Sequence, residues 1–239
     1  MVLRHELGGK VGVKVKTFSL TDLVAGKIKK VELRLSGSAY RGVPLGSLRL
    51  ATANPVWVRY RRQQGQRPGL RMPVLLATAG TVRETDISSA LKSPLVASNL
   101  RMVKLDLPGL GEQQLQFVDP QVDLEGGLVR IRSTLVTAGA QPDSGVSILI
   151  AGKPQLEGDS RIVVSDLQTQ SPDIIDPDKF AAFAQDLLNP LIDFSKLDRL
   201  DHAFRLQTLK VGDEAVEFSG NLLVAPKVAR VAQQVVNKR

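Results

Sequence analysis

The chain has 239 residues, of which 43% are hydrophobic and 23% charged, and it carries a net charge of +8 and no cysteine. This composition excludes an intrinsically disordered chain, and the lack of cysteine excludes disulfides and thiolate chemistry. All-β sandwiches and barrels reach about 250 residues as one unit, and no low-complexity linker or fixed-period repeat divides the sequence, so we expect a single domain over residues 1–239.

The positive charge is concentrated in the first third of the chain. Residues 1–83 contain 16 Lys/Arg and 3 Asp/Glu, whereas residues 84–239 contain 16 and 21. Such an excess indicates an anionic partner near the N-terminal part, either lipid headgroups or nucleic acid. A solvated strand face in a basic protein explains the same excess without any partner.

Alternation of apolar and polar residues is the main structural signal, and it begins with the valines of residues 11–15 against Lys14 and Lys16. A period of two predicts strands with one buried face. The pattern returns at residues 31–35, 48–50, 56–60, 103–107, 129–131, 148–150, 162–164, 204–206 and 216–224. Glycine-containing turn signals lie between many of these segments, at residues 36–38, 108–111, 125–127, 140–145 and 212–214. The chain is therefore expected to be β-dominated and antiparallel.

Only two segments predict helices. The first is short and runs over residues 86–92, where Thr85 or Asp86 can cap the free amides and Pro94 ends the helix. The second has Asp176 at the cap position and Pro177 at the first helical position. Its apolar residues follow with helical spacing until Pro190 stops the helix near Asn189. An apolar helix of this kind covers one face or one end of a sheet.

Residues for nucleophilic or metal-assisted catalysis are scarce. The sequence has no G-x-S-x-G motif, and its two histidines are His5, near the terminus, and His202, which favours a surface position among acids. Gly109 and Gly111 form a G-x-G without the third glycine or the helix that nucleotide binding needs. The acidic stretches 173–178 and 193–201 are explained by helix capping and solvation more readily than by a bound cation. We expect no enzyme activity, no cofactor and no metal.

One basic stretch fits an anionic ligand. Five arginines without an intervening acid lie beside Trp57 and Tyr60, namely Arg59, Arg61, Arg62, Arg67 and Arg71. Anionic headgroups require only the charges, whereas single-stranded nucleic acid also requires a stacking platform, for which two aromatics are few. A solvated loop is the third interpretation.

The order of segments resembles the LmeA-like phospholipid-binding family. The resemblance lies in VKTFSLTDLVAGKIKKVELRLSG at 15–37, in TVRETDISSAL at 81–91, and in the stretch from Asn189 to Val224, which pairs an apolar helix end with two strands. It implies an α+β, β-dominated fold in which a long curled antiparallel sheet or barrel-like tube is packed with one long and one short helix. It also implies binding or transfer of phospholipid, or another amphipathic lipid, at the bacterial cell envelope. The resemblance further implies a location in the cell envelope or periplasm, or peripherally on a membrane. The opening MVLRHELGGK shows no apolar signal-peptide region.

Burial of acyl chains is the mechanism that such a fold would use, and it needs no catalytic group. The predicted lipid-binding residues are the apolar helix face, which lies along the groove, and the five arginines, which meet phosphate. The helix residues are Phe180, Phe183, Leu187, Leu188 and Leu191. The same helix residues can instead simply fill the core. The alternative function is a structural or scaffold protein with a packed core that binds a protein partner; nucleic acid is not expected, and the sequence leaves the oligomeric state open.

Overall fold

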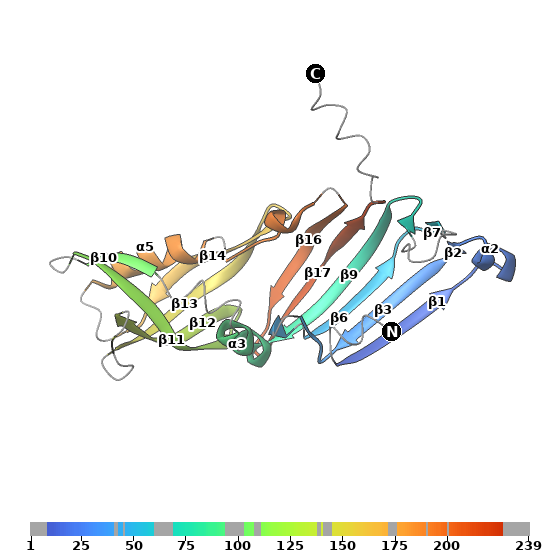
Figure 1. The fold of residues 1–239 in the computed structure, drawn as a ribbon. Helices are drawn as coiled ribbons and strands as arrows, with labels where there is room; N and C mark the ends of the chain where they lie inside the picture. Colours follow the sequence, from blue (N-terminus) through green and yellow to red (C-terminus); the bar gives the residue numbers. More distant parts are fainter. Residues whose placement is uncertain are drawn as a thin grey trace, which may run out of the picture.

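Two six-stranded antiparallel sheets make up most of the computed structural model and give an elongated molecule (Figure 1). The structure describes residues 9–40, 43–44, 46–59, 69–93, 103–107, 111–137, 140, 145–171, 176–189, 191–199 and 201–226. The predicted β-dominated class with a curled antiparallel sheet and few helices is confirmed. The strands are divided between two sheets, whereas the resemblance implied one long sheet.

The first sheet is built from both ends of the chain. Its order is β1 (Lys10–Lys16), β3 (Lys30–Ser36), β6 (Ser47–Thr52), β9 (Val74–Arg83), β17 (Ala215–Val224) and β16 (His202–Val211). Strand β9 pairs with β6 on one side and, along its whole length, with β17 on the other. It is therefore the strand that joins the N-terminal and C-terminal parts.

The second sheet follows the chain order of residues 103–193. It consists of β10 (Val103–Leu107), β11 (Gly111–Glu125), β12 (Leu128–Thr137), β13 (Val146–Glu157), β14 (Arg161–Thr169) and β15 (Ile192–Asp193). The turn predicted at 125–127 joins β11 and β12, where Gly126 and Gly127 have φ of 60° and 77°. Positive φ at two successive positions suits the right-handed twist of a tight hairpin and favours glycine.

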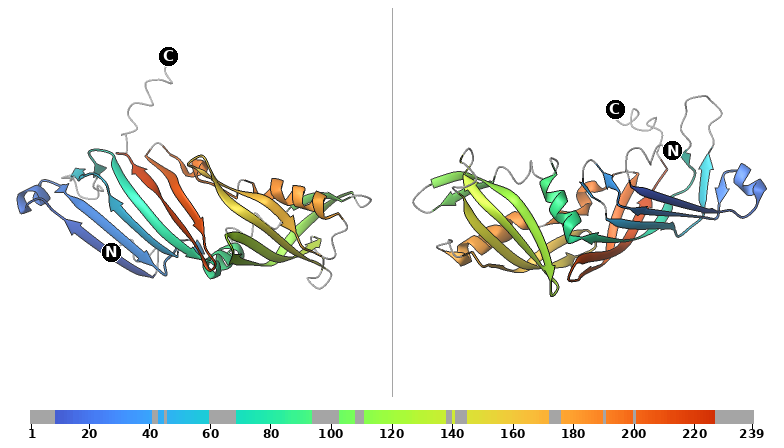
Figure 2. Two further views of the ribbon diagram at one scale, coloured as in Figure 1. Left: turned by 180° about the vertical axis from the view of Figure 1, so that it is seen from behind. Right: turned by 90° about the horizontal axis from the view of Figure 1, so that it is seen from below.

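Two small sheets complete the strands. One joins β2 (Lys27–Ile28), β7 (Val56–Arg59) and β8 (Gly69–Leu70), and the other joins β4 (Ala39–Tyr40) and β5 (Val43–Pro44). The first of these lies at the end of the molecule farthest from the second sheet, next to α2 (Leu20–Val24) (Figures 1 and 2).

Both predicted helices are present. Helix α5 spans Pro177–Leu188, and its N-cap Asp176 accepts a hydrogen bond from the Lys179 amide at 3.1 Å, as the sequence indicated. Helix α3 spans Glu84–Lys92 and begins two residues before the predicted start, because β9 runs directly into it. Asp86 Oδ2 accepts a hydrogen bond from the amide of the N-cap residue Arg83 at 3.2 Å.

Two short helical segments were not predicted. They are α2, capped by Ser19 Oγ, which accepts from the Asp22 amide at 3.0 Å, and a 3₁₀ turn at Phe194–Leu197, capped by Asp193. Each is only four or five residues long, so neither repeats an apolar face often enough to produce a helical period. The capping residues Ser19 and Asp193 are the sequence features that could have indicated these two segments.

The described hydrophobic core lies between α5 and the second sheet. Its buried cluster contains Ile148, Ile150, Val164, Leu167, Phe180 and Ala184, and Phe117, Leu135, Phe183 and Leu188 pack against it. Asn189 fixes the end of α5 to β14, because its Oδ1 accepts from the Val164 amide at 2.7 Å and its Nδ2 donates to the Val164 carbonyl at 3.0 Å. Helix α5 thus covers the second sheet.

We expect Ile148→Ala to lower the free energy of unfolding by about 2–5 kcal/mol, because the fully buried side chain would leave a cavity among its neighbours. Urea denaturation followed by circular dichroism measures this. Ile192→Ala, at a position that is 43% exposed, should cost less than about 1 kcal/mol. Equal losses for the two variants would contradict the position of the core.

Hydrogen bonds and ion pairs join the two sheets. Ser88 Oγ in α3 accepts from the Val122 amide of β11 at 2.9 Å. Arg205 in β16 donates two hydrogen bonds to the Asp198 carboxylate, at 2.9 and 2.6 Å, and lies 3.6 Å from Asp159 in the turn between β13 and β14. The Arg205 hydrogen bond lowers the pKa of Asp198, although partial burial opposes the shift.

Because the pKa of Asp198 is lowered in the folded protein, its ionised form stabilises the fold at neutral pH, and this contribution is lost as the pH falls through the folded-state pKa. Asp198→Asn should therefore lower the melting temperature at pH 7, and the difference from the parent protein should shrink at acid pH. Melting curves between pH 7 and pH 3 test this. Asp178→Asn, at an exposed position of α5, is the control. A difference that stays constant with pH would exclude the ion pair as its cause.

Candidate functional site

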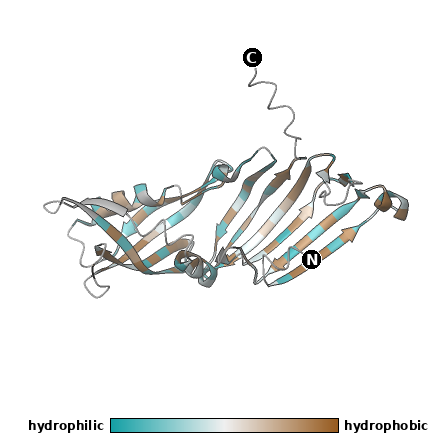
Figure 3. Ribbon diagram, in the orientation of Figure 1, coloured by the Kyte–Doolittle hydropathy of each residue, from teal (hydrophilic) through white to brown (hydrophobic). Residues whose placement is uncertain are grey.

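The first sheet has one apolar face that crosses all six strands, here called the apolar face. The register places Leu35 opposite Leu48, Leu48 opposite Gly80, and Gly80 opposite Phe218, so alternate residues of every strand share this side. Figure 3 shows the alternation as hydrophobic and hydrophilic bands along the strands. The large apolar members of this face are Val11, Val13, Val15, Val31, Leu33, Leu35, Leu48, Leu50, Val74, Leu76, Val82, Phe204, Leu206, Leu209, Val211, Val216, Phe218, Leu222 and Val224.

Exposure of the apolar face is uneven. Leu35, Leu50, Val74 and Leu206 are buried, whereas in the edge strand β1 Val13 is 60% exposed and Val15 is 49% exposed. None of the described helices lies across this face, because α5 packs against β14 and α3 contacts β9 only at the end of the strand. The margin formed by β1 is thus the part of the apolar face that is open to a ligand.

Gly80 keeps the middle of this face flat. A Cβ atom at this position would lie 2.5 Å from the Phe218 ring, so the ring occupies the space that a side chain would need. Only glycine allows this close approach in the centre of a strand. Gly80 therefore allows the Phe218 ring of β17 to pack directly over the backbone of β9.

The opposite side of β1, β3 and β6 is basic and is here called the basic face. It carries Lys10, Lys14, Lys16, Lys30, Arg34 and Arg49 around a single carboxylate, Glu32. Glu32 lies 3.4 Å from Lys30, 3.7 Å from Arg49 and 4.0 Å from Arg34. Burial acts to raise the pKa of Glu32, but the Lys30 hydrogen bond and the surrounding positive charges lower it on balance. The structure thus gathers much of the N-terminal positive charge on one surface.

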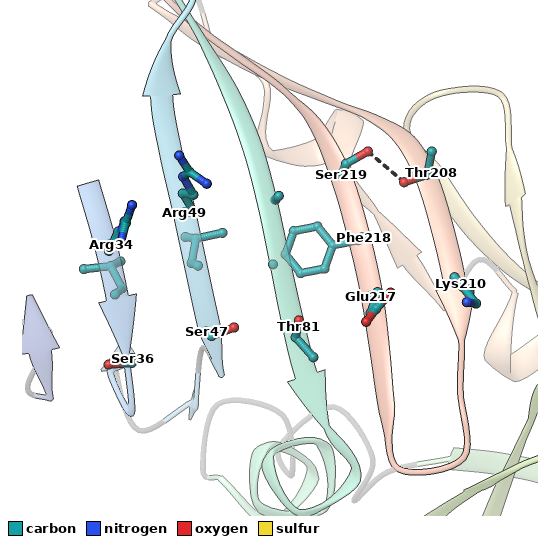
Figure 4. Close-up of a pocket in the computed structure, with 14 residues that line it drawn as sticks. Arg34, Ser36, Ser47, Arg49, Thr81, Thr208, Lys210, Glu217, Phe218 and Ser219 are labelled. Atoms are coloured by element: carbon teal, nitrogen blue, oxygen red, sulfur yellow. Dashed lines mark hydrogen bonds between the residues drawn. The ribbon is translucent and has the colours of Figure 1, made fainter. Parts of the chain in front are cut away.

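A shallow trough of about 690 Å³ crosses the first sheet over β3, β6, β9, β17 and β16 (Figure 4). Arg34, Arg49 and Lys210 line it together with Glu217, and the hydroxyl groups of Thr208 and Ser219 lie 2.7 Å apart within it. Charges of both signs beside hydroxyl groups can hydrogen-bond a polar or zwitterionic group. The arginine side chains are more than half exposed, so such contacts remain strongly screened by solvent.

The predicted lipid-binding helix residues lie mainly in the core of the second sheet. Phe180 is buried, and Phe183 and Leu188 pack against the same cluster. Leu191 follows the helix and is 37% exposed, while the side chain of Leu187 lies outside the described part of the structure. This arrangement agrees with the core-filling interpretation, and contact of these residues with lipid stays a prediction.

The five predicted arginines are only partly described. Arg59 ends β7 and Arg71 follows β8, and both are exposed. Arg61, Arg62 and Arg67 lie outside the described residues. The backbone amide of Arg71 donates to the Trp57 carbonyl at 2.8 Å, so Arg71 lies beside β7, which ends at Arg59. Binding of phosphate by these arginines stays a prediction.

The residues weighed for catalysis or cation binding have local structural roles where they are described. His202 Nδ1 lies 2.9 Å from Asp201 Oδ1 in a partly exposed pair. Asp176 and Asp193 cap helical segments, and hydrogen bonds from Lys179 and Ser195 lower the pKa values of these two carboxyl groups. Among the described residues, no three His, Asp or Glu side chains are grouped as metal ligands would be. None of the described helices is both long and apolar enough to cross a membrane.

The continuous apolar face was missed by sequence reasoning. Each strand showed its own alternation, but the order of strands in the sheet, and hence which apolar rows adjoin, depends on the pairing of β9 with β17. Helix α2 and its exposed residues were also missed, because a five-residue helix is too short to show a helical period in the sequence.

The fold and these surfaces define a β-rich protein whose first sheet is aliphatic on one face and, over β1, β3 and β6, basic on the other. The chain belongs to the LmeA-like phospholipid-binding family, whose profile matches residues 2–221. This confirms the resemblance seen in the sequence. No curated protein and no solved structure matches the chain.

Glu32→Gln should strengthen binding to anionic vesicles about fivefold at low salt, since one positive charge near an anionic membrane contributes about 1 kcal/mol and Glu32 neutralises one such charge. Vesicle co-sedimentation at 50 mM and 500 mM salt measures the effect, which should shrink at the higher salt. Glu157→Gln removes a paired carboxylate on the second sheet and should change binding little. Equal effects of both variants would contradict a special role for the basic face.

Proposed function

We propose that the protein binds phospholipid without chemical change and carries or presents it at a membrane surface of the bacterial cell envelope. The acyl chains lie against the apolar face of the first sheet and enter at β1. The observation that carries this proposal is the apolar face itself, which spans six strands and exposes Val13 and Val15 at its edge.

The energetics favour holding a lipid in this way. Each methylene removed from water contributes about 0.8 kcal/mol, so burying about ten methylenes supplies roughly 8 kcal/mol before the cost of ordering the lipid. The cost of ordering the lipid reduces this gain, so the bound lipid can still be released, as a carrier requires. Burial acts on any acyl chain, so it needs neither a nucleophile nor a general base, and we propose a non-catalytic role.

The basic face supports the choice of a membrane surface. Six lysines and arginines around Glu32 attract anionic headgroups and hold the protein near the layer from which a lipid would enter. The polar headgroup of a bound lipid can remain in water at the β1 edge, where the apolar and basic faces meet. The lipid therefore does not have to bury its charge.

A scaffold function is the second candidate, and the edge position of β1 favours it. Among the described residues β1 pairs only with β3, so its outer side is available for pairing with a strand of another protein. Its lysines oppose such pairing, since edge charges are a common protection against it. If the protein is a scaffold, we expect the purified protein to contain no bound lipid.

Native mass spectrometry of the purified protein, with lipid extraction of the same sample, tests the proposal. We expect phospholipid in near-stoichiometric amount, either co-purified or after incubation with phosphatidylglycerol. Val13→Gln/Val15→Gln should reduce bound lipid several-fold, because it removes the exposed aliphatic margin of the apolar face without changing the charge. Val146→Gln/Ile192→Gln makes the same apolar-to-polar change at exposed positions of the second sheet and should leave bound lipid unchanged. A lipid-free mass before and after incubation would reject the proposal in favour of the scaffold.

A further inference from the structure

The free end of the first sheet exposes an unusual group of apolar side chains. Leu20 and Val24, the first and last residues of α2, are each 81% exposed, and Phe18, just before this helix, is 52% exposed. Trp57 of β7 is 36% exposed and is the only tryptophan of the chain. We call the described residues 16–30 and 56–59 the α2 tip. Single exposed apolar residues are common on proteins, but a cluster of large ones indicates an interaction surface.

Positive charge surrounds this apolar group. The α2 tip contains five Lys/Arg residues and one acid, Asp22. Lys27 Nζ lies 5.3 Å from the ring centre of Trp57, and Lys29 Nζ lies 5.8 Å from that of Phe18. Lys27 also lies 3.8 Å from Asp22 in α2, which ties Trp57 and the helix into one structure. Each aromatic ring is thus paired with a cation.

This chemistry matches the interface between lipid headgroups and acyl chains. Aliphatic side chains gain from entering the acyl boundary, tryptophan favours the headgroup level, and lysines extend their charge toward anionic headgroups. A protein partner would bury the same apolar residues, but lysine is depleted in protein interfaces, whereas lysines beside tryptophan and aliphatic side chains are typical of surfaces that lie in the membrane interface. Charge complementarity therefore selects an anionic membrane.

We propose that the α2 tip is the part of the protein that inserts into the headgroup layer of membranes containing anionic phospholipid. Leu20 and Val24 enter the acyl boundary, Trp57 lies at headgroup depth, and Lys27 and Lys29 contact lipid phosphates. This inference deepens the proposed function and rests on it, because it names the surface that meets the membrane. Figures 1 and 2 place α2 at the end of the molecule, where the second sheet cannot obstruct a bilayer.

The emission of Trp57 provides a direct test on the unmodified protein. Adding vesicles of phosphatidylglycerol and phosphatidylcholine should shift the emission to shorter wavelength, and brominated acyl chains should quench it. Vesicles of phosphatidylcholine alone should give a weaker response. Absence of both the shift and the quenching while the protein sediments with vesicles would overturn the proposal. A single-stranded oligonucleotide that produces the same shift and displaces the protein from vesicles would overturn it in favour of nucleic acid.

Variants separate the apolar and the charged contributions. Leu20→Glu/Val24→Glu should weaken vesicle binding at least about tenfold, since it removes the inserted aliphatics and adds repulsion. Lys27→Gln/Lys29→Gln should weaken binding to anionic vesicles about fivefold for each lysine and leave binding to phosphatidylcholine unchanged. Val146→Glu/Ile192→Glu makes the same apolar-to-acid change at exposed positions of the second sheet and should have little effect.

Lipid content measured by native mass spectrometry distinguishes failure of this inference from failure of the proposed function. Leu20→Glu/Val24→Glu should keep its bound phospholipid while losing vesicle binding, because α2 is not part of the apolar face. If this variant still binds vesicles as the parent does and still carries lipid, membrane insertion by the α2 tip is overturned and the proposed function remains intact. If the protein contains no lipid but Trp57 still enters vesicles, this result would reject the proposed function and support insertion of the α2 tip into membranes.

Discussion

The antiparallel register of the first sheet is the constraint on which the other features depend. Because side chains alternate along each strand, a shift of one residue between β9 and either neighbour would mix aliphatic and charged rows. The observed register keeps Leu48, Gly80 and Phe218 in one row and Arg49, Ala79 and Ser219 in the next. Two chemically distinct faces follow from this pairing, one aliphatic across the sheet and one basic over β1, β3 and β6.

The second sheet has a different role, which its core explains. Helix α5 packs on the apolar surface of β13 and β14, so this sheet is stabilised by its own buried cluster. It is formed by residues inserted between β9 and β16, and Arg205, Ser88 and their partners tie it to the first sheet. A stable second sheet can anchor the first, whose apolar face is then less dependent on a covering helix for its structure.

The charged residues also divide by role. Glu32 holds three basic neighbours close together, while Asp176 and Asp193 cap helical segments and Asp198 binds Arg205. The remaining positive charges at the α2 tip lie beside exposed aromatic and aliphatic groups. In the proposed function, lipid would pass between the α2 tip and the β1 margin of the apolar face, because the tip directly follows β1 along the chain.

The sequence by itself determined the local features, because these depend on neighbours along the chain. The alternation at 11–15 and 31–35, the hairpin at 125–127 and the Asp176–Pro177 start of α5 were all readable, and the motifs at 15–37 and 81–91 identified the family. Tertiary structure alone decided that α5 packs on the second sheet and that β9 joins β6 to β17. Alternation states which residues share a face of one strand, but strand order is set by pairing between segments more than 100 residues apart. The exposure of Leu20 and Val24, 81% each, likewise follows from the tertiary structure, because it depends on how α2 packs beside β2.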